Sequence, residues 1–165
     1  MQGLREWNIE ARALKIRYLP FTHNFWVLTD SNNNIIDQIH GLAVDPITRA
    51  TKAMGNADHL LQVVCDPTID WSIQPGQPRI ICSTDIETEV KRRWQTAVNS
   101  IPAINALKLR YPNLWQHLYR KNSNTVFNTI GKIMGFSTPA LLLPTRAPGI
   151  NLVISQDIIN YYLYK

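Results

Sequence analysis

The chain has little cysteine, no long apolar run and no metal-ligand spacing. Its 165 residues include two cysteines, Cys65 and Cys82, which lie in separate apolar runs. This excludes a zinc-type cluster and a disulfide framework, although one bridge between the two is compatible with the sequence. No apolar stretch of about 18 residues and no basic-then-apolar leader is present, so we expect no membrane span and no secretory signal. We also expect no metal or other cofactor, and export would need a specialised route.

Acidic residues are outnumbered, with 12 Asp and Glu against 17 Lys and Arg, which gives a net charge of +5. A mild basic excess favours anionic partners such as nucleic acid, acidic lipid or the bacterial cell wall. The densest basic cluster, Lys91-Arg92-Arg93, falls in an expected helix that also carries acidic residues, so we interpret it as a solvated helix face. No basic stripe is interleaved with stacking aromatics, which disfavours nucleic-acid binding.

A hydrophobic content of 45% in 165 residues is enough for one core, so we expect a single domain, 1–165, of the α+β class. Period-two alternation and turn residues predict strands within 10–19, 23–29, 35–40, 59–65 and 79–83, with irregular stretches at 41–56 and 66–78. Helical spacing predicts a helix from a cap at Ser83, Thr84 or Asp85 to about Ser100, ended by Pro102, then a short piece at 103–111 and a helix at 124–134 closed by Gly135. Residues 136–150 should form a loop before a final apolar segment.

Two histidines should meet across the first hairpin. Its turn centres on residues 31–34, so position 23 lies opposite positions 40–42 of the next strand. His23 and His40 are therefore expected to be neighbours. A pair of imidazoles suits a general base whose ring is oriented by a second polar group. The alternative is that one or both are ordinary histidines at strand ends.

Ser123 lies between two asparagines immediately before an apolar-periodic helix. This position is favoured by N-cap side chains, which explains the serine without catalysis. The same position suits a nucleophile, because free N–H groups and the positive end of the helix dipole stabilise a developing oxyanion. Cys65 and Cys82 end β-like runs and are interpreted as buried structural thiols rather than rival nucleophiles. His59 and His117 have no evident partners in the sequence.

The segments His23-Asn24-Phe25-Trp26 and Asn122-Ser123-Asn124-Thr125 occur in an order that resembles the circularly permuted papain-like superfamily. That superfamily includes the NlpC-type peptidases and the lecithin retinol acyltransferase-like proteins. The match covers the hairpin and the late helix, whereas residues 43–81 have no counterpart. The resemblance implies Ser123 in the nucleophile position, His23 as general base and His40 as an orienting group.

What the resemblance implies is an amide or ester hydrolase, with a bacterial wall peptide as substrate. A small basic hydrolase of this kind is also similar to an antibacterial effector delivered by a type VI secretion system into a target periplasm, with an immunity protein as partner. Ser123 departs from the usual cysteine, and a hydroxyl depends wholly on its base. It is therefore a working nucleophile, the trace of a lost activity or an engineered replacement of cysteine. A catalytically inactive papain-like binding module is the alternative function.

Overall fold

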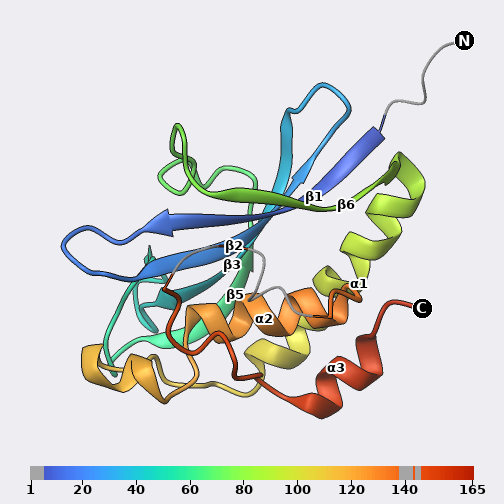
Figure 1. Ribbon diagram of the computed structural model, residues 1–165. Helices are drawn as coiled ribbons and strands as arrows, with labels where there is room; N and C mark the ends of the chain where they lie inside the picture. Colours follow the sequence, from blue (N-terminus) through green and yellow to red (C-terminus); the bar gives the residue numbers. More distant parts are fainter. Residues whose placement is uncertain (1–5, 138–142, 144–145) are drawn as a thin grey trace, which may run out of the picture.

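A six-stranded antiparallel sheet packed against helices forms the molecule (Figure 1). The computed structural model describes residues 6–137, 143 and 146–165. Residues 138–142 and 144–145 of the loop expected at 136–150 therefore lie outside the described residues. The strands are β1 (Glu6–Lys15), β2 (Thr22–Thr29), β3 (Ile35–Val44), β4 (Thr51–Lys52), β5 (Leu60–Cys65) and β6 (Arg79–Ile86). The helices are α1 (Glu87–Asn105), the 3-10 helix η1 (Leu114–Leu118), α2 (Ser123–Ile133) and α3 (Gln156–Tyr162).

The α+β class and the antiparallel sheet with helices are confirmed. The strands lie in the order β4-β3-β2-β1-β6. β5 pairs with the edge of β3 opposite to the one that β2 and β4 share. Several expected strand bounds need correction. β1 ends at Lys15, because Tyr18 has a left-handed φ of 66° in the following turn. β3 continues to Val44, and the short β4 interrupts the stretch expected to be irregular.

The start and end of α1 also differ from the prediction. Ser83, Thr84 and Asp85 do not cap the helix, because they pair with β1 as part of β6, and α1 begins at Glu87 without a side-chain cap. Pro102 lies inside the helix rather than ending it. A proline inside a helix lacks an N–H donor and crowds the carbonyl group four residues earlier, and α1 ends three residues after Pro102. Burial of Ile104, just beyond it, offsets that loss.

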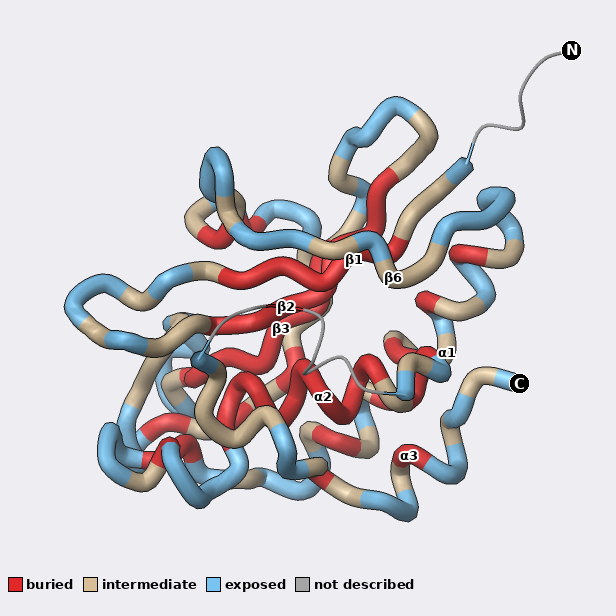
Figure 2. The backbone as a smooth tube through the Cα atoms, viewed as in Figure 1, coloured by how far each residue is buried: buried red, intermediate tan, exposed pale blue. Residues whose placement is uncertain are grey.

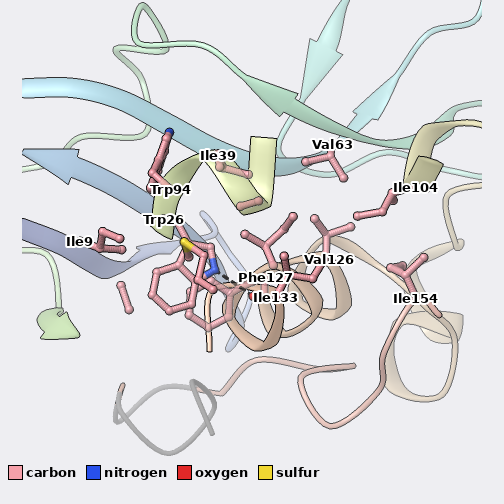
Figure 3. Close-up of a cluster of buried hydrophobic side chains, with 14 of the residues drawn as sticks. Ile9, Trp26, Ile39, Val63, Trp94, Ile104, Val126, Phe127, Ile133 and Ile154 are labelled. Carbon is pink, nitrogen blue, oxygen red and sulfur yellow. Dashed lines mark hydrogen bonds between the residues drawn. The ribbon is translucent and has the colours of Figure 1, made fainter. Parts of the chain in front are cut away.

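The main core lies between the sheet and α1 and α2, while α3 packs against both helices. Figure 2 shows buried residues concentrated in the central strands and along α2. Trp26 and Phe127 stack with ring centroids 4.5 Å apart, and the Trp26 indole N–H donates to the Phe127 carbonyl oxygen at 2.8 Å (Figure 3). Removing such a buried aromatic side chain costs about 3–5 kcal/mol. This contact fixes α2 over β2.

β2 and β3 separate at one end of their ladder, and this gap positions the site. Their paired residues run from Thr29 and Ile35 to Trp26 and Ile39. Beyond that point β4 takes the edge of β3 that β2 has left, pairing with Ala43 and Val44. The N-terminus of α2 fills the gap beside β2.

Candidate functional site

Ser123 and Asn124, the first residues of α2, bridge the gap between β2 and β3. The Asn124 side chain accepts from the Asn24 N–H and donates to the Thr22 carbonyl oxygen, both at 2.9 Å. These backbone groups flank His23. On the other side, a Cβ added to Gly41 would lie 2.9 Å from the Ser123 Cα atom. Glycine at position 41, directly after His40, therefore allows the helix to reach β3.

The expected contact between His23 and His40 is confirmed. The His23 Nε2 and His40 Nδ1 atoms lie 2.9 Å apart. The His40 Nε2 atom lies 3.1 Å from the Gln38 side-chain oxygen, which also accepts from the Ser72 hydroxyl at 2.7 Å. Four buried side chains thus form one hydrogen-bonded chain, Ser72–Gln38–His40–His23, which we call the imidazole relay.

The relay determines which ring nitrogens carry protons. The Gln38 amide nitrogen donates to the Ile69 carbonyl oxygen at 3.0 Å, so its side-chain oxygen faces His40 as an acceptor. His40 must then donate from Nε2 and accept at Nδ1, and His23 must donate from Nε2. The remaining nitrogen, His23 Nδ1, is a buried acceptor without a hydrogen-bond partner in the described part of the chain.

Burial keeps both imidazoles neutral. It lowers the pKa of His23 to about 4, because no side chain compensates for the lost hydration of the charged ring. The pKa of His40 is lowered further, first by burial and then by the charge of His23. Phe25 stacks on His40 with centroids 4.4 Å apart, and Trp71 lies 6.2 Å from His23. A neutral, oriented imidazole is the form that a general base requires.

Ser123 is not the N-cap, so this part of the prediction is wrong. Asn122 caps α2, accepting from the Asn124 and Thr125 N–H groups at 2.9 and 3.3 Å. It can do so because its amide group also donates to the carbonyl oxygens of His117 and Pro148. Ser123 occupies the first helical position and is 4% exposed. The cap therefore does not use its hydroxyl.

Tyr111 is a buried neighbour of Ser123 on the helix side of the sheet. Burial raises the pKa of Tyr111 to about 12, and Ser123 partly opposes that rise. The Tyr111 hydroxyl donates to the Ala53 carbonyl oxygen at 3.0 Å.

No hydrogen bond joins Ser123 to either imidazole in the described chain. Side chains alternate along a strand, and Ile39 and Gly41 face the helices, so His40 points to the opposite face. His23, flanked by Asn24 and paired with Leu14 of β1, points to that same face. The structure therefore brings His23 and His40 together on one side of the gap and Ser123 against its other side.

The remaining histidines and both cysteines lie away from this arrangement. His59 bonds Asn56 at 2.9 Å. His117 lies edge-on to Tyr111 with centroids 5.3 Å apart, and its Nε2 atom has no partner among the described residues. Cys65 and Cys82 are free, and burial raises the pKa of each thiol, to about 11 for Cys82. High thiol pKa values fit structural cysteines rather than nucleophiles.

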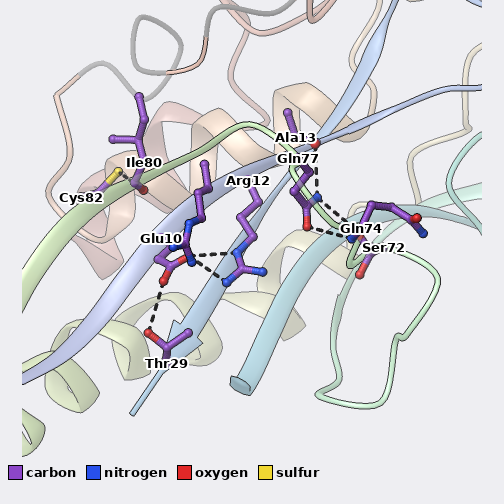
Figure 4. A network of polar contacts seen from close by, with 10 residues as sticks. Glu10, Arg12, Ala13, Thr29, Ser72, Gln74, Gln77, Ile80 and Cys82 are labelled. Carbon is purple, nitrogen blue, oxygen red and sulfur yellow. Dashed lines mark hydrogen bonds and ion pairs between the residues drawn. The ribbon is translucent and has the colours of Figure 1, made fainter. Parts of the chain in front are cut away.

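A buried ion pair supports the face that carries the imidazoles. The Arg12 guanidinium lies 2.9 Å from the Glu10 carboxylate, and Glu10 also accepts from the Thr29 hydroxyl at 3.4 Å (Figure 4). This ion pair was not predicted from the sequence, and neither were the roles of Gln38, Ser72 and Tyr111. Strand alternation could have placed Gln38 beside His40, but Ser72 and Tyr111 arrive from distant segments.

The cationic cluster of α1 is explained by local pairing. Lys91 and Arg92 pair with Glu87 and Glu89 on the helix surface. Arg93 is partly buried and donates to the Met134 carbonyl oxygen at 2.8 Å. The expected solvated face is therefore correct for Lys91 and Arg92, while Arg93 ties α1 to the end of α2.

The described residues contain no cluster of His, Cys, Asp and Glu side chains that could hold a metal ion. They also include no helix that is long and apolar enough to cross a membrane. No known protein-family model matches the chain, and neither a curated protein nor a solved structure matches it.

Proposed function

We propose that this protein is an amide or ester hydrolase with a permuted papain-like site, in which His23 is the general base and Ser123 the nucleophile. The observation that carries the proposal is the imidazole relay. It fixes the tautomer of His23 and leaves the Nδ1 atom as a buried acceptor without a partner. An unpaired buried polar group costs about 1–3 kcal/mol. A proton taken from a nucleophile would satisfy it.

In the proposed reaction, the Ser123 hydroxyl reaches His23 through the gap between β2 and β3, and His23 Nδ1 takes its proton. The serine oxygen attacks the substrate carbonyl carbon and forms an acyl-enzyme, while His23 returns the proton to the leaving amine or alcohol. Water then releases the acyl group by the same steps in reverse order. The positive end of the α2 dipole would stabilise the oxyanion, while the Asn124 and Thr125 N–H groups stay bonded to the Asn122 cap. His40 acts as a positioning residue.

We further propose a bacterial wall peptide as the substrate and an antibacterial role. The net charge of +5 supports this choice, because a basic protein is retained by an anionic polymer. Delivery through a type VI secretion system into a target periplasm, with an immunity protein as partner, belongs to the same proposal. The resemblance of the His23 and Ser123 segments supports it.

A catalytically silent binding module is the second candidate. The placement of Ser123 favours it, because no hydrogen bond joins Ser123 to either imidazole in the described chain. A cysteine at the same position would ionise at a helix N-terminus with less dependence on His23. The two candidates therefore differ in what a Ser123→Cys substitution does.

The test is expression in a bacterial periplasm, with lysis and soluble wall fragments as the readouts. The parent chain is compared with Ser123→Ala, Ser123→Cys and His23→Ala. His59→Gln is the matched control, since His59 is buried but lies outside the gap. We expect the parent and His59→Gln to lyse cells, and both alanine variants to lose at least about 100-fold in fragment release. If only Ser123→Cys lyses cells, the parent chain is the catalytically inactive binding module. If every chain is inert, the wall-hydrolase proposal is wrong.

A further inference from the structure

A basic cavity lies beside the imidazole relay, at the end of β1. Its volume is about 540 Å³, and it lies between the last residues of β1 and the loop 74–78. Lys15 and Arg17 line one side, and Gln74, Pro75, Gln77 and Pro78 line the other. None of the lining residues is acidic. The cavity therefore offers positive charge beside apolar proline rings.

The loop wall of this cavity is firmly held. The Gln77 amide nitrogen donates to the carbonyl oxygens of Ala13 and Ser72, at 3.2 and 3.1 Å (Figure 4). The Gln77 side-chain oxygen accepts from the Gln74 N–H at 3.1 Å. Because Ser72 is also the first member of the imidazole relay, the same loop shapes the cavity and orients His40.

The floor of the cavity exposes an unpaired edge of β1. Ala13 uses its outward N–H and carbonyl groups to bond Pro78 and Gln77. Outward-facing backbone groups recur every second residue, so Lys15 presents the next pair. No partner for these groups occurs in the described part of the chain, because pairing with β6 ends at Arg12. Such an edge can pair with an extended peptide.

The cations beside that edge are available to a ligand. Neither Lys15 nor Arg17 forms an ion pair among residues 6–137, 143 and 146–165. The Arg17 guanidinium carbon lies 4.7 Å from the centre of the exposed Tyr18 ring, which leaves its N–H groups free. Leu14, which also lines the cavity, pairs directly with His23 of β2. The cavity is thus one strand away from the proposed base.

We propose that this cavity binds an extended peptide segment with a free carboxylate. The peptide backbone pairs with the Lys15 edge of β1, and the carboxylate binds between the Lys15 and Arg17 side chains. The proposal rests on the proposed function only in taking this segment to be part of the substrate. Binding itself requires neither Ser123 nor His23.

The test is an NMR titration of the ¹⁵N-labelled Ser123→Ala chain, which prevents turnover. The probes are N-acetyl-Ala-Ala, its C-terminal amide and acetate. We expect N-acetyl-Ala-Ala to shift the amide signals of Lys15 and Gly76 and to bind at least about 5-fold more tightly than the other two probes. The double variant Lys15→Gln/Arg17→Gln should lose this preference. Lys52→Gln, which removes an exposed lysine on β4, should keep it.

Equal binding of the dipeptide acid and its amide overturns the role of the cations. Equal binding of acetate and the dipeptide overturns pairing with β1, and shifts confined to other residues overturn the location. Each variant is first compared with the parent by its amide spectrum, and Lys15→Gln alone replaces the double variant if that does not fold. These results are independent of lysis. A chain that binds the dipeptide but lyses no cells refutes the hydrolase proposal alone.

Discussion

Tyr111 is a buried neighbour of Ser123, and its oxygen can accept from the serine hydroxyl. Its own hydroxyl donates to the Ala53 carbonyl oxygen, so its lone pairs are left to accept from Ser123. His23 Nδ1, the acceptor that the hydrolase proposal requires, competes for the same proton from the other side of the gap. At the scale of single residues, Ser123 can act as a nucleophile when its hydroxyl donates to His23, and it is inactive when the hydroxyl donates to Tyr111.

Replacing Tyr111 by phenylalanine should release Ser123 toward His23. We expect Tyr111→Phe to react several-fold faster with a fluorophosphonate at Ser123, because the competing acceptor is lost. It should also lose about 1–2 kcal/mol of unfolding free energy, since the Ala53 carbonyl oxygen loses its donor. Mass spectrometry of the labelled peptide measures the rate. Tyr162→Phe is the control, as Tyr162 packs against the same core. An unchanged labelling rate would show that Tyr111 does not restrain the serine.

The N-terminus of α2 depends on one side chain that serves two segments. Asn122 accepts from the helix N–H groups and donates to η1 and to the strap at residues 146–150. The strap is close: a Cβ added to Gly149 would lie 2.6 Å from the Asn122 amide nitrogen, and Gly149 has a φ of +79°. Ser155, the cap of α3, accepts only one N–H, that of Ile158.

Asn122→Ala should therefore destabilise the protein more than Ser155→Ala. The loss of the cap and of donors to two carbonyl oxygens predicts a decrease of about 2–4 kcal/mol in unfolding free energy, against about 1 kcal/mol for Ser155→Ala. Urea unfolding followed by tryptophan fluorescence measures both. Equal losses would mean that the bonds to η1 and the strap contribute no net stability.

Strands and helices were predicted correctly from the sequence where a local pattern of residues decides the structure. β2, β3, β5 and α2 were found because their apolar spacing is regular, and the contact of His23 with His40 followed from hairpin register. The extension of β6 over 83–86 was missed because pairing with β1 overrides a capping pattern. The role of Asn122 was assigned to Ser123, since both are good caps and only tertiary partners distinguish them. Ser72 lies about 34 residues from Gln38, and Tyr111 lies about 12 residues from Ser123. No local sequence pattern spans such separations.

At the scale of the whole molecule, the sheet separates two kinds of interior. The helix face holds the apolar core, from Ile9 to Ile154. The opposite face holds the imidazole relay and the ion pair of Glu10 and Arg12, covered in part by the loop 66–78. Two neutral histidines buried on that polar face make the stability of the fold depend on pH.

The sign of that dependence follows from the direction of the pKa shifts. Burial lowers the pKa of His23 from 6.5 to about 4, and the pKa of His40 is also lowered, so the unfolded chain binds protons that the folded chain does not. Stability is complete above the ordinary histidine pKa and is lost as the pH falls from about 6.5 toward 4. His117, whose pKa burial also lowers, acts in the same direction.

His23→Phe should remove a large part of this dependence. Linkage for His23 alone predicts a loss of about 2 kcal/mol in unfolding free energy between pH 7 and pH 5, which a phenylalanine cannot contribute. We therefore expect the parent chain to lose at least that amount in urea unfolding, and His23→Phe to lose about 2 kcal/mol less. His59→Gln is the control and should follow the parent. A His23→Phe chain with the same pH slope as the parent would show that His23 binds protons equally in the folded and unfolded chains, so that burial does not lower its pKa.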